Sequence, residues 1–149
     1  MGAAADLAAT DVVPLVSWWL GQHPAVTAAL GPAGHVSMRN EAPWPCLTVT
    51  DTTAGSDGDL LRLISPEIQF EAYGDLDGNP GKAALRALLY TVLGAMRELA
   101  DQPWPYAGAP DGCPVVTWVA SSRSGGWSPL AGGQPRYLGA VRVYCHPPN

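Results

Sequence analysis

Hydrophobic residues recur at helical spacing over a long stretch in the middle of the chain. Asn79 suits the N-cap of a helix and Pro80 its first position, so a helix is predicted from there to about Leu99 or Ala100. Its apolar stripe comprises Leu85, Leu88, Leu89, Val92, Leu93, Met96 and Leu99. The opposite side carries Lys82, Arg86, Tyr90 and Arg97. One face of this helix is therefore expected to pack on a core.

A shorter amphipathic stretch predicts a second helix near the N-terminus. Thr10 or Asp11 can cap it, and Pro14 falls in the first turn, where a missing N–H is tolerated. The pattern predicts that this helix ends at about Gly21, before Pro24.

Alternation of apolar and polar residues marks the strands, most clearly at residues 67–74. There Ile68, Phe70 and Ala72 alternate with Glu67, Gln69, Glu71 and Tyr73. Further strands are predicted at residues 46–53, 115–120 and 136–146, with a short one at 35–39. Residues 54–59 and 121–134 are rich in Gly and Ser and are predicted to be loops.

This order of elements predicts an α+β fold. We expect a mostly antiparallel sheet of four to five strands, with one long helix packed on a face and an N-terminal helix. Residues 1–149 are predicted to form a single domain, in which residues 1–9 are a flexible tail. The core contacts are predicted between Leu85, Leu88, Val92 and Met96 on the helix and Ile68, Phe70, Val141 and Val143 on the strands.

Charge is scarce in this chain, at 14% of residues, and the formal net charge is −5. Sequence-specific DNA-binding domains normally present a basic patch, and the sequence shows none. A surface so poor in charge suggests that other subunits cover much of it. No apolar run approaches the length of a membrane span, so no membrane partner is expected.

Candidate chemistry is sparse. Cys46, Cys113 and Cys145 are too few and too widely spaced for a disulfide framework, and buried free thiols in a reducing compartment are expected. They lack the spacing of zinc ligands. Residues 75–83 resemble a phosphate-binding or calcium loop but lack required positions of both motifs. No metal or cofactor is expected.

Catalytic patterns are equally weak. No serine lies in a G-x-S-x-G nucleophile elbow. The carboxylate pairs Asp57/Asp59 and Glu67/Glu71 are interpreted as solvated or interface charge. The chain is therefore not expected to be an enzyme.

Tryptophan is unusually frequent, with six residues against one phenylalanine. Trp18 and Trp19 are adjacent on a helix and cannot both face one core comfortably, so one should be partly exposed or lie at an interface. Trp127 lies in the predicted loop 121–134. Plugging the ends of a small core is the equally weighted alternative for such tryptophans.

Several segments together resemble one protein family. They are the N-terminal helix leading into WLGQHPAVTAALG, the lead APWPCLTVT into the first main strand, the strand ISPEIQFEAYGD, the Pro-capped helix and the last strand PRYLGAVRVYCH. In element order and segment character, about residues 12–146 resemble the tail terminator (tail completion) proteins of long-tailed phages, especially phages of GC-rich actinobacterial hosts.

That resemblance implies a virion structural protein. Six copies would form a ring on the head-proximal end of the tail tube, end polymerisation of the major tail tube protein and join the tail to the head–tail connector or stopper protein. The implied location is the head–tail junction of the virion, after assembly in the host cytoplasm. Six copies at −5 each give about −30, so double-stranded DNA should pass through without binding. The alternatives are another neck component, such as a head-completion or connector protein, and a small α+β enzyme or ligand-binding domain.

Candidate interface residues follow from the loops and the helix tryptophans. An edge strand and the N-terminal helix are expected to be buried between chains. The loop of residues 54–62 is a candidate for an acidic lumen or tube contact, and residue types favoured at interfaces mark the margins of loop 121–134. The candidates are Trp18, Trp19, Asp57, Asp59, Arg62, Arg123, Trp127 and Arg136.

Overall fold

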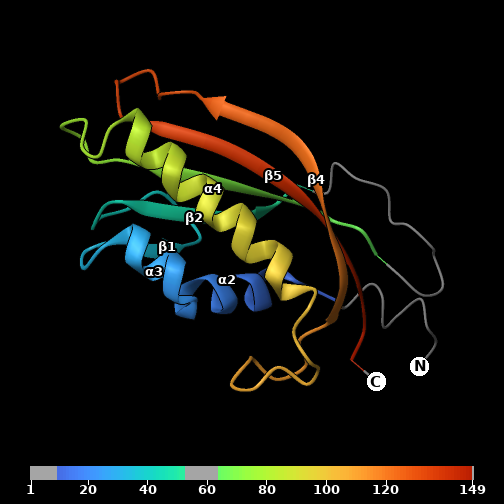
Figure 1. The fold of residues 1–149 in the computed structure, drawn as a ribbon. Helices are drawn as coiled ribbons and strands as arrows, with labels where there is room; N and C mark the ends of the chain where they lie inside the picture. The colour runs from blue at the N-terminus through green and yellow to red at the C-terminus, as the bar shows by residue number, and fades with distance from the viewer. Residues whose placement is uncertain (1–9, 53–63, 149) are drawn as a thin grey trace.

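The computed structural model describes residues 10–52 and 64–148 (Figure 1). Its elements are α2 (Val13–Gln22), α3 (Pro24–Leu30), β1 (His35–Ser37), β2 (Cys46–Asp51), β3 (Glu67–Tyr73), α4 (Lys82–Leu99), β4 (Val115–Trp127) and β5 (Arg136–His146). The strands form one five-stranded sheet in the order β1-β2-β3-β5-β4. Among these described strands, β1 and β2 pair in parallel and every other pair is antiparallel. The predicted α+β fold is confirmed.

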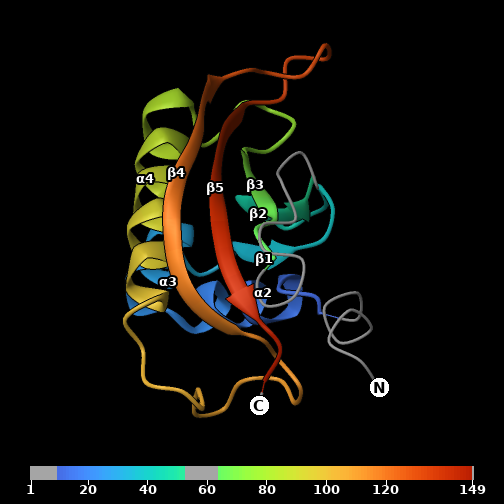
Figure 2. The same ribbon diagram turned by 90° about the vertical axis from the view of Figure 1, so that its right-hand side faces the viewer.

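The helices form one layer on one face of the sheet (Figure 2). Helix α4 contacts β3, β4 and β5, while α2 contacts β1 and β2 and α3 packs on α4. The predicted apolar stripe of α4 faces the sheet: Leu85, Leu88, Val92 and Met96 join Ile68, Phe70, Val141 and Val143 in one buried cluster. The other sheet face carries the polar positions of β3.

The predicted caps differ from those observed. Helix α4 begins at Lys82 with Gly81 as its N-cap, so the prediction of Asn79 as cap and Pro80 as first residue is wrong. The Asp75 Oδ1 atom accepts hydrogen bonds from the backbone N–H groups of Asp77 (2.9 Å) and Asn79 (2.8 Å). Asn79 is therefore part of an Asx-type turn formed by Asp75, and the helix begins only after this turn.

Helix α2 is shifted in the same way, because it begins at Val13 with Val12 as N-cap. Asp11 still contributes, since its Oδ1 atom accepts the Val13 N–H at 3.0 Å. Pro14 lies in the first turn as predicted. His23 ends the helix and caps α3, where its Nδ1 atom accepts the Ala25 N–H at 3.2 Å.

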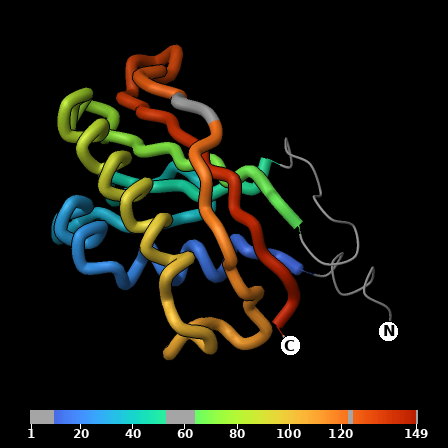
Figure 3. Tube along the Cα trace, turned by 45° about the vertical axis from the view of Figure 1, so that its right-hand side comes forward, coloured from blue at the N-terminus to red at the C-terminus, as the bar shows by residue number. Residues whose placement is uncertain are grey.

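The hairpin of β4 and β5 is longer than the sequence pattern indicated (Figure 3). Residues 121–134 were predicted to be a loop, but β4 continues to Trp127 and the connection is only residues 128–135. Trp127 pairs with Tyr137, across register shifts typical of β-bulges. Strand pairing uses backbone groups, so a Ser- and Gly-rich sequence can form an edge strand that side-chain alternation does not reveal.

Candidate functional site

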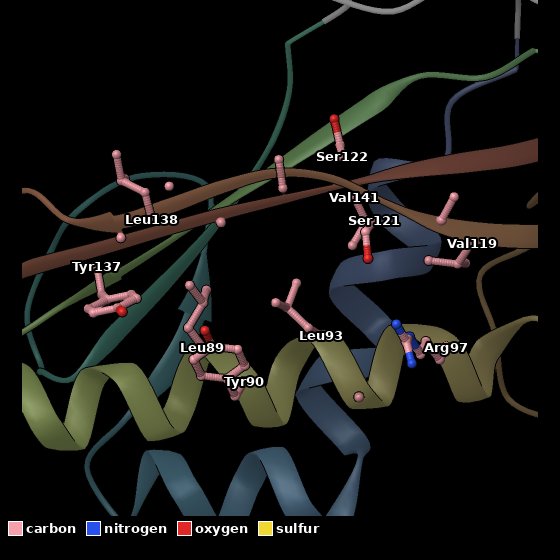
Figure 4. A pocket seen from close by; sticks show the side chains of 16 residues that line it. Leu89, Tyr90, Leu93, Arg97, Val119, Ser121, Ser122, Tyr137, Leu138 and Val141 are labelled. Atoms are coloured by element: carbon pink, nitrogen blue, oxygen red, sulfur yellow. The ribbon is translucent and has the colours of Figure 1, made fainter.

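A groove of about 620 Å³ separates α4 from the β4–β5 hairpin (Figure 4). Its walls are apolar: Leu89 and Leu93 come from α4, and Val119, Tyr137 and Val141 from the strands. Serine, glycine and alanine from β4, residues 138–140 of β5, and Tyr90, Gly94 and Arg97 from α4 complete the lining. The groove therefore combines apolar walls with polar serine, tyrosine and arginine side chains.

Small residues explain why this space is open. No side chain fills the position at Gly94, where an added Cβ would meet nothing within 4 Å, and Gly126 on β4 is similar. At Gly139 the opposite holds, because a Cβ there would lie 2.8 Å from Leu89 Cδ2. Gly139 thus lets α4 approach β5 closely, while the glycines and Ser121 leave room beside it.

The groove carries one positive charge, and a second lies close to it on α4. Arg97 is the one charged residue among the described residues that line it. Arg86 lies one helical turn before Tyr90, and its guanidinium carbon sits 4.8 Å from the centre of the Tyr90 ring, a cation–π distance. Tyr90 itself is 54% exposed. The groove therefore suits an apolar group that carries negative charge beside it.

Strand β4 is a long sheet edge next to this groove. It spans thirteen residues, and no described strand pairs with its outer side. Trp118 is 62% exposed on β4, and Trp127 at its end is 38% exposed. An unpaired edge with exposed aromatic residues is a typical site for contact with another chain.

Trp18 and Trp19 occupy different environments, as predicted. Trp19 is buried, and its Nε1–H donates to the Ala95 carbonyl oxygen at 2.8 Å. Trp18 is only half-buried, with its ring centre 6.3 Å from that of Trp19. The prediction that one of the pair is partly exposed is confirmed, and burial of Trp18 between chains stays a prediction.

Arg136 is tied to its own chain. Its Nε donates to the Ser128 carbonyl oxygen at 2.8 Å, and a terminal nitrogen lies 3.6 Å from Glu71 Oε1. Trp127 ends β4 and Arg136 begins β5, so both flank the connection of residues 128–135, which is shorter than the predicted loop 121–134. Arg123 belongs to β4, and its side chain lies outside the described residues.

The other loop candidates were Asp57, Asp59 and Arg62, which all lie outside the described residues. The remaining candidates do not form one cluster, since Trp18 is on α2 while Trp127 and Arg136 lie at the turn end of the β4–β5 hairpin. The groove was missed by the sequence analysis. Two residues in the sequence could have indicated the groove: Gly94 inside a helix and Gly139 inside a strand. Glycine destabilises the interior of both kinds of element, so its presence there often marks open space or the close approach of another element.

The polar sheet face carries a hydrogen-bonded carboxylate. Glu71 accepts from the Tyr73 hydroxyl at 2.7 Å and from Gln69 Nε2 at 3.1 Å, beside Arg136. Burial, together with the hydrogen bond to Glu71, raises the pKa of Tyr73 to about 12. This network therefore has a structural role in the fold.

The second carboxylate of that strand is buried. Glu67 is 3% exposed and lies 3.9 Å from an Arg142 nitrogen, so the expectation of solvated or interface charge is wrong for Glu67. Arg142 also donates to the Ser65 carbonyl oxygen at 2.7 Å. This arginine keeps the buried carboxylate close to a positive charge, as a buried acid requires.

The cysteines are free and weakly acidic. Burial raises the pKa of Cys46, Cys113 and Cys145, in the last case to about 12. A thiol in that state is a poor nucleophile and a poor metal ligand. Within residues 10–52 and 64–148, no three His, Cys, Asp or Glu residues are grouped to hold a metal ion. No helix in the same part of the chain has the length and apolar character to cross a membrane.

Comparison with known proteins adds no relative: no protein-family model matches the chain, and no curated protein matches it.

Proposed function

We propose that this chain is a tail terminator protein of a long-tailed phage. In this proposal six copies form a ring on the head-proximal end of the tail tube, end its polymerisation and join the tail to the head–tail connector. The segments quoted above carry the resemblance. The α+β fold has an N-terminal helix, a long helix and a final hairpin, which agrees with the element order on which the resemblance rests.

The uncovered edge of β4 is the observation that carries the proposal. This edge runs for thirteen residues beside an apolar groove, and Trp118 and Trp127 are exposed on it. In a ring of identical subunits, each chain contacts its two neighbours through two different patches. Such patches must be exposed in the isolated chain, as the edge of β4 is. Trp18 on α2 is half-buried and packs partly against the core, so only part of its ring is available to a second patch.

Low charge and net acidity fit a channel for DNA. A ring of six copies carries a formal charge of about −30, and DNA phosphates are repelled by such a ring. Of the basic side chains, Arg136 and Arg142 are engaged with Glu71 and Glu67. We therefore expect double-stranded DNA to pass through the ring without binding specifically to it.

A small-molecule-binding domain is the second candidate, because one observation favours it. The groove volume of about 620 Å³ lies in the range of ligand pockets. Another neck component is the third possibility, since it would share the location of a terminator. The mass in solution separates a ring, at about 94 kDa for six chains of 15.6 kDa, from a monomeric binding domain.

The location and copy number in the virion test the proposal. Gold-labelled antibody against this chain should bind at the junction of head and tail once the two are gently separated, on the tail side. Quantitative mass spectrometry of purified virions should give six copies for each particle. Label at the tail tip or on the capsid, or absence of the chain from virions, contradicts the proposal, and label on the head side favours another neck component.

A further inference from the structure

An apolar side chain projects from an acidic turn just before α4. Leu76 is 72% exposed, and Asp75 and Asp77 flank it. The turn, residues 75–79, is the light-green loop beside the first turn of α4, at the end of the molecule opposite the C-terminus (Figure 1). A single exposed leucine on a surface requires no explanation. Leu76 differs from such a residue because two carboxylates flank it and the turn that carries it is held by hydrogen bonds.

Hydrogen bonds within the turn hold Leu76 outward. Asp75 N donates to the Asn79 carbonyl oxygen at 2.7 Å, and Asp75 Oδ1 accepts the Asp77 and Asn79 amides. The turn therefore does not need to reorganise before it binds a partner. Preorganised groups lose little entropy on binding, so even a small contact of this kind can contribute to affinity.

The groove between α4 and the β4–β5 hairpin has the complementary character. Its walls are formed by Leu89, Leu93 and Val119, and Arg97 stands on its rim. Among the described residues that line the groove there is no carboxylate. The turn 75–79, an apolar side chain flanked by two carboxylates, is complementary to the groove in both polarity and charge.

We infer that the groove of one copy of this chain receives the turn 75–79 of a second copy. Leu76 enters between Leu93 and Val119, and Asp77 faces Arg97. The inference rests on the proposed ring, because it names the contact by which one subunit meets the next. The turn and the groove are different patches of one chain, so the contact is head-to-tail and can repeat around a ring.

The charge distribution favours a second copy over a foreign partner. The chain is acidic, at −5, so copies repel one another unless acidic and basic surfaces meet. Arg86 and Arg97 place a basic strip along the exposed side of α4, and the turn supplies acidic groups on the same molecule. A single gene product thus carries both halves of a complementary pair.

Substitution of Leu76 tests the contact through the oligomeric state. Native mass spectrometry and sedimentation velocity of the full chain should show oligomers, and Leu76→Asp should weaken each contact at least tenfold. Because Leu76 is exposed, this variant should unfold at the same temperature as the wild type when both are measured at a concentration where the wild type is dissociated. Met38→Asp is the matched control, since Met38 is 69% exposed and lies away from both surfaces, and it should assemble normally.

Charge reversal provides a rescue. Arg97→Glu and Asp77→Arg should each weaken assembly, and the double variant should recover it, because every contact then joins the same two positions with their charges exchanged. Normal assembly of Leu76→Asp, failure of the double variant to recover, or a wild-type chain that stays monomeric at high concentration overturns this contact. None of these results alters the location of the chain in virions, so the proposed function is tested separately.

Cross-linking decides between arrangements of the subunits. In a Cys113→Ser background, Leu76→Cys chains mixed with Ser121→Cys chains should give a disulfide-linked dimer that contains one chain of each kind. Each variant alone should give no such product. A product from Leu76→Cys alone would indicate a two-fold contact between turns and would overturn the inference.

Discussion

Gly139→Ala probes the close approach of α4 to β5 that borders the groove. An added Cβ lies 2.8 Å from Leu89 Cδ2 and 3.3 Å from Leu89 Cγ, whereas carbon atoms pack comfortably at about 3.5–4.0 Å. Leu89 is 2% exposed and also lines the groove, so its side chain can turn toward that space only by giving up part of its present packing. The helix or the side chain must therefore shift.

Two effects of opposite sign determine the magnitude. Overpacking a core costs about 1–3 kcal/mol, while replacing glycine restricts the unfolded chain and stabilises by about 0.4–1 kcal/mol. The steric effect wins, and we expect the free energy of unfolding to fall by about 1–2 kcal/mol. For a chain of this length, that lowers the melting temperature by about 3–6 °C.

The assay is urea unfolding followed by tryptophan fluorescence, with Leu89→Ala as the second arm of a double-mutant cycle. Leu89→Ala alone should cost about 2–5 kcal/mol, because it creates a cavity. Together the two substitutions should cost less than the sum of the single changes by about 1 kcal/mol, because the alanine at position 139 then has space. Additive costs, or Gly139→Ala with wild-type stability, would refute this account of the helix–sheet contact.

Three further predictions concern the core, the polar sheet face and the thiols. Leu88→Ala should lower the free energy of unfolding by about 2–5 kcal/mol in urea titrations, because Leu88 is 2% exposed between α4 and the sheet; unchanged stability would show that another face of the helix packs there. The pKa of Tyr73 is raised to about 12, so its stabilising contribution is complete below about pH 10 and is lost as the pH rises toward 12. In urea titrations between about pH 9 and 11, the free energy of unfolding should therefore fall more steeply with pH for the wild type than for Tyr73→Phe. Equal slopes would contradict this. At about pH 8 a thiol reagent should label half-buried Cys113 first and Cys145 only after unfolding, as mass spectrometry of the labelled peptides can establish, and early labelling of Cys145 would mean that its strand opens readily.

Periodicity in the sequence was sufficient to predict the helix–sheet core. The stripe from Leu85 to Met96 and the alternation around Phe70 directly reflect burial, which is why both were predicted correctly. Helix starts were less predictable, because Asn79 can act as a cap or take part in a turn, and the Asp75 carboxylate determined which. The local sequence contains both possibilities.

Periodicity did not predict the full length of the β4–β5 hairpin or the groove. Residues 121–127 pair through their backbone, so their Ser and Gly composition indicated a loop where there is a strand. The groove is lined by small residues from two elements that are distant in the sequence, such as Gly94 on α4 and Ser121 on β4, and only the folded chain brings them to one site. Trp127 was selected from its place in a predicted loop, but it is exposed for a different reason, since it ends a strand.

The length of tails made without this chain tests the central claim most directly. The proposed function predicts that an early stop codon in the gene for this chain, placed in a phage genome that carries it, yields filled heads without tails and tubes longer than those of the wild type, as measured by electron microscopy of the lysate. Supplying the wild-type chain from a plasmid should restore tails of normal length and joined particles. Complete particles with tails of normal length in its absence would contradict the account.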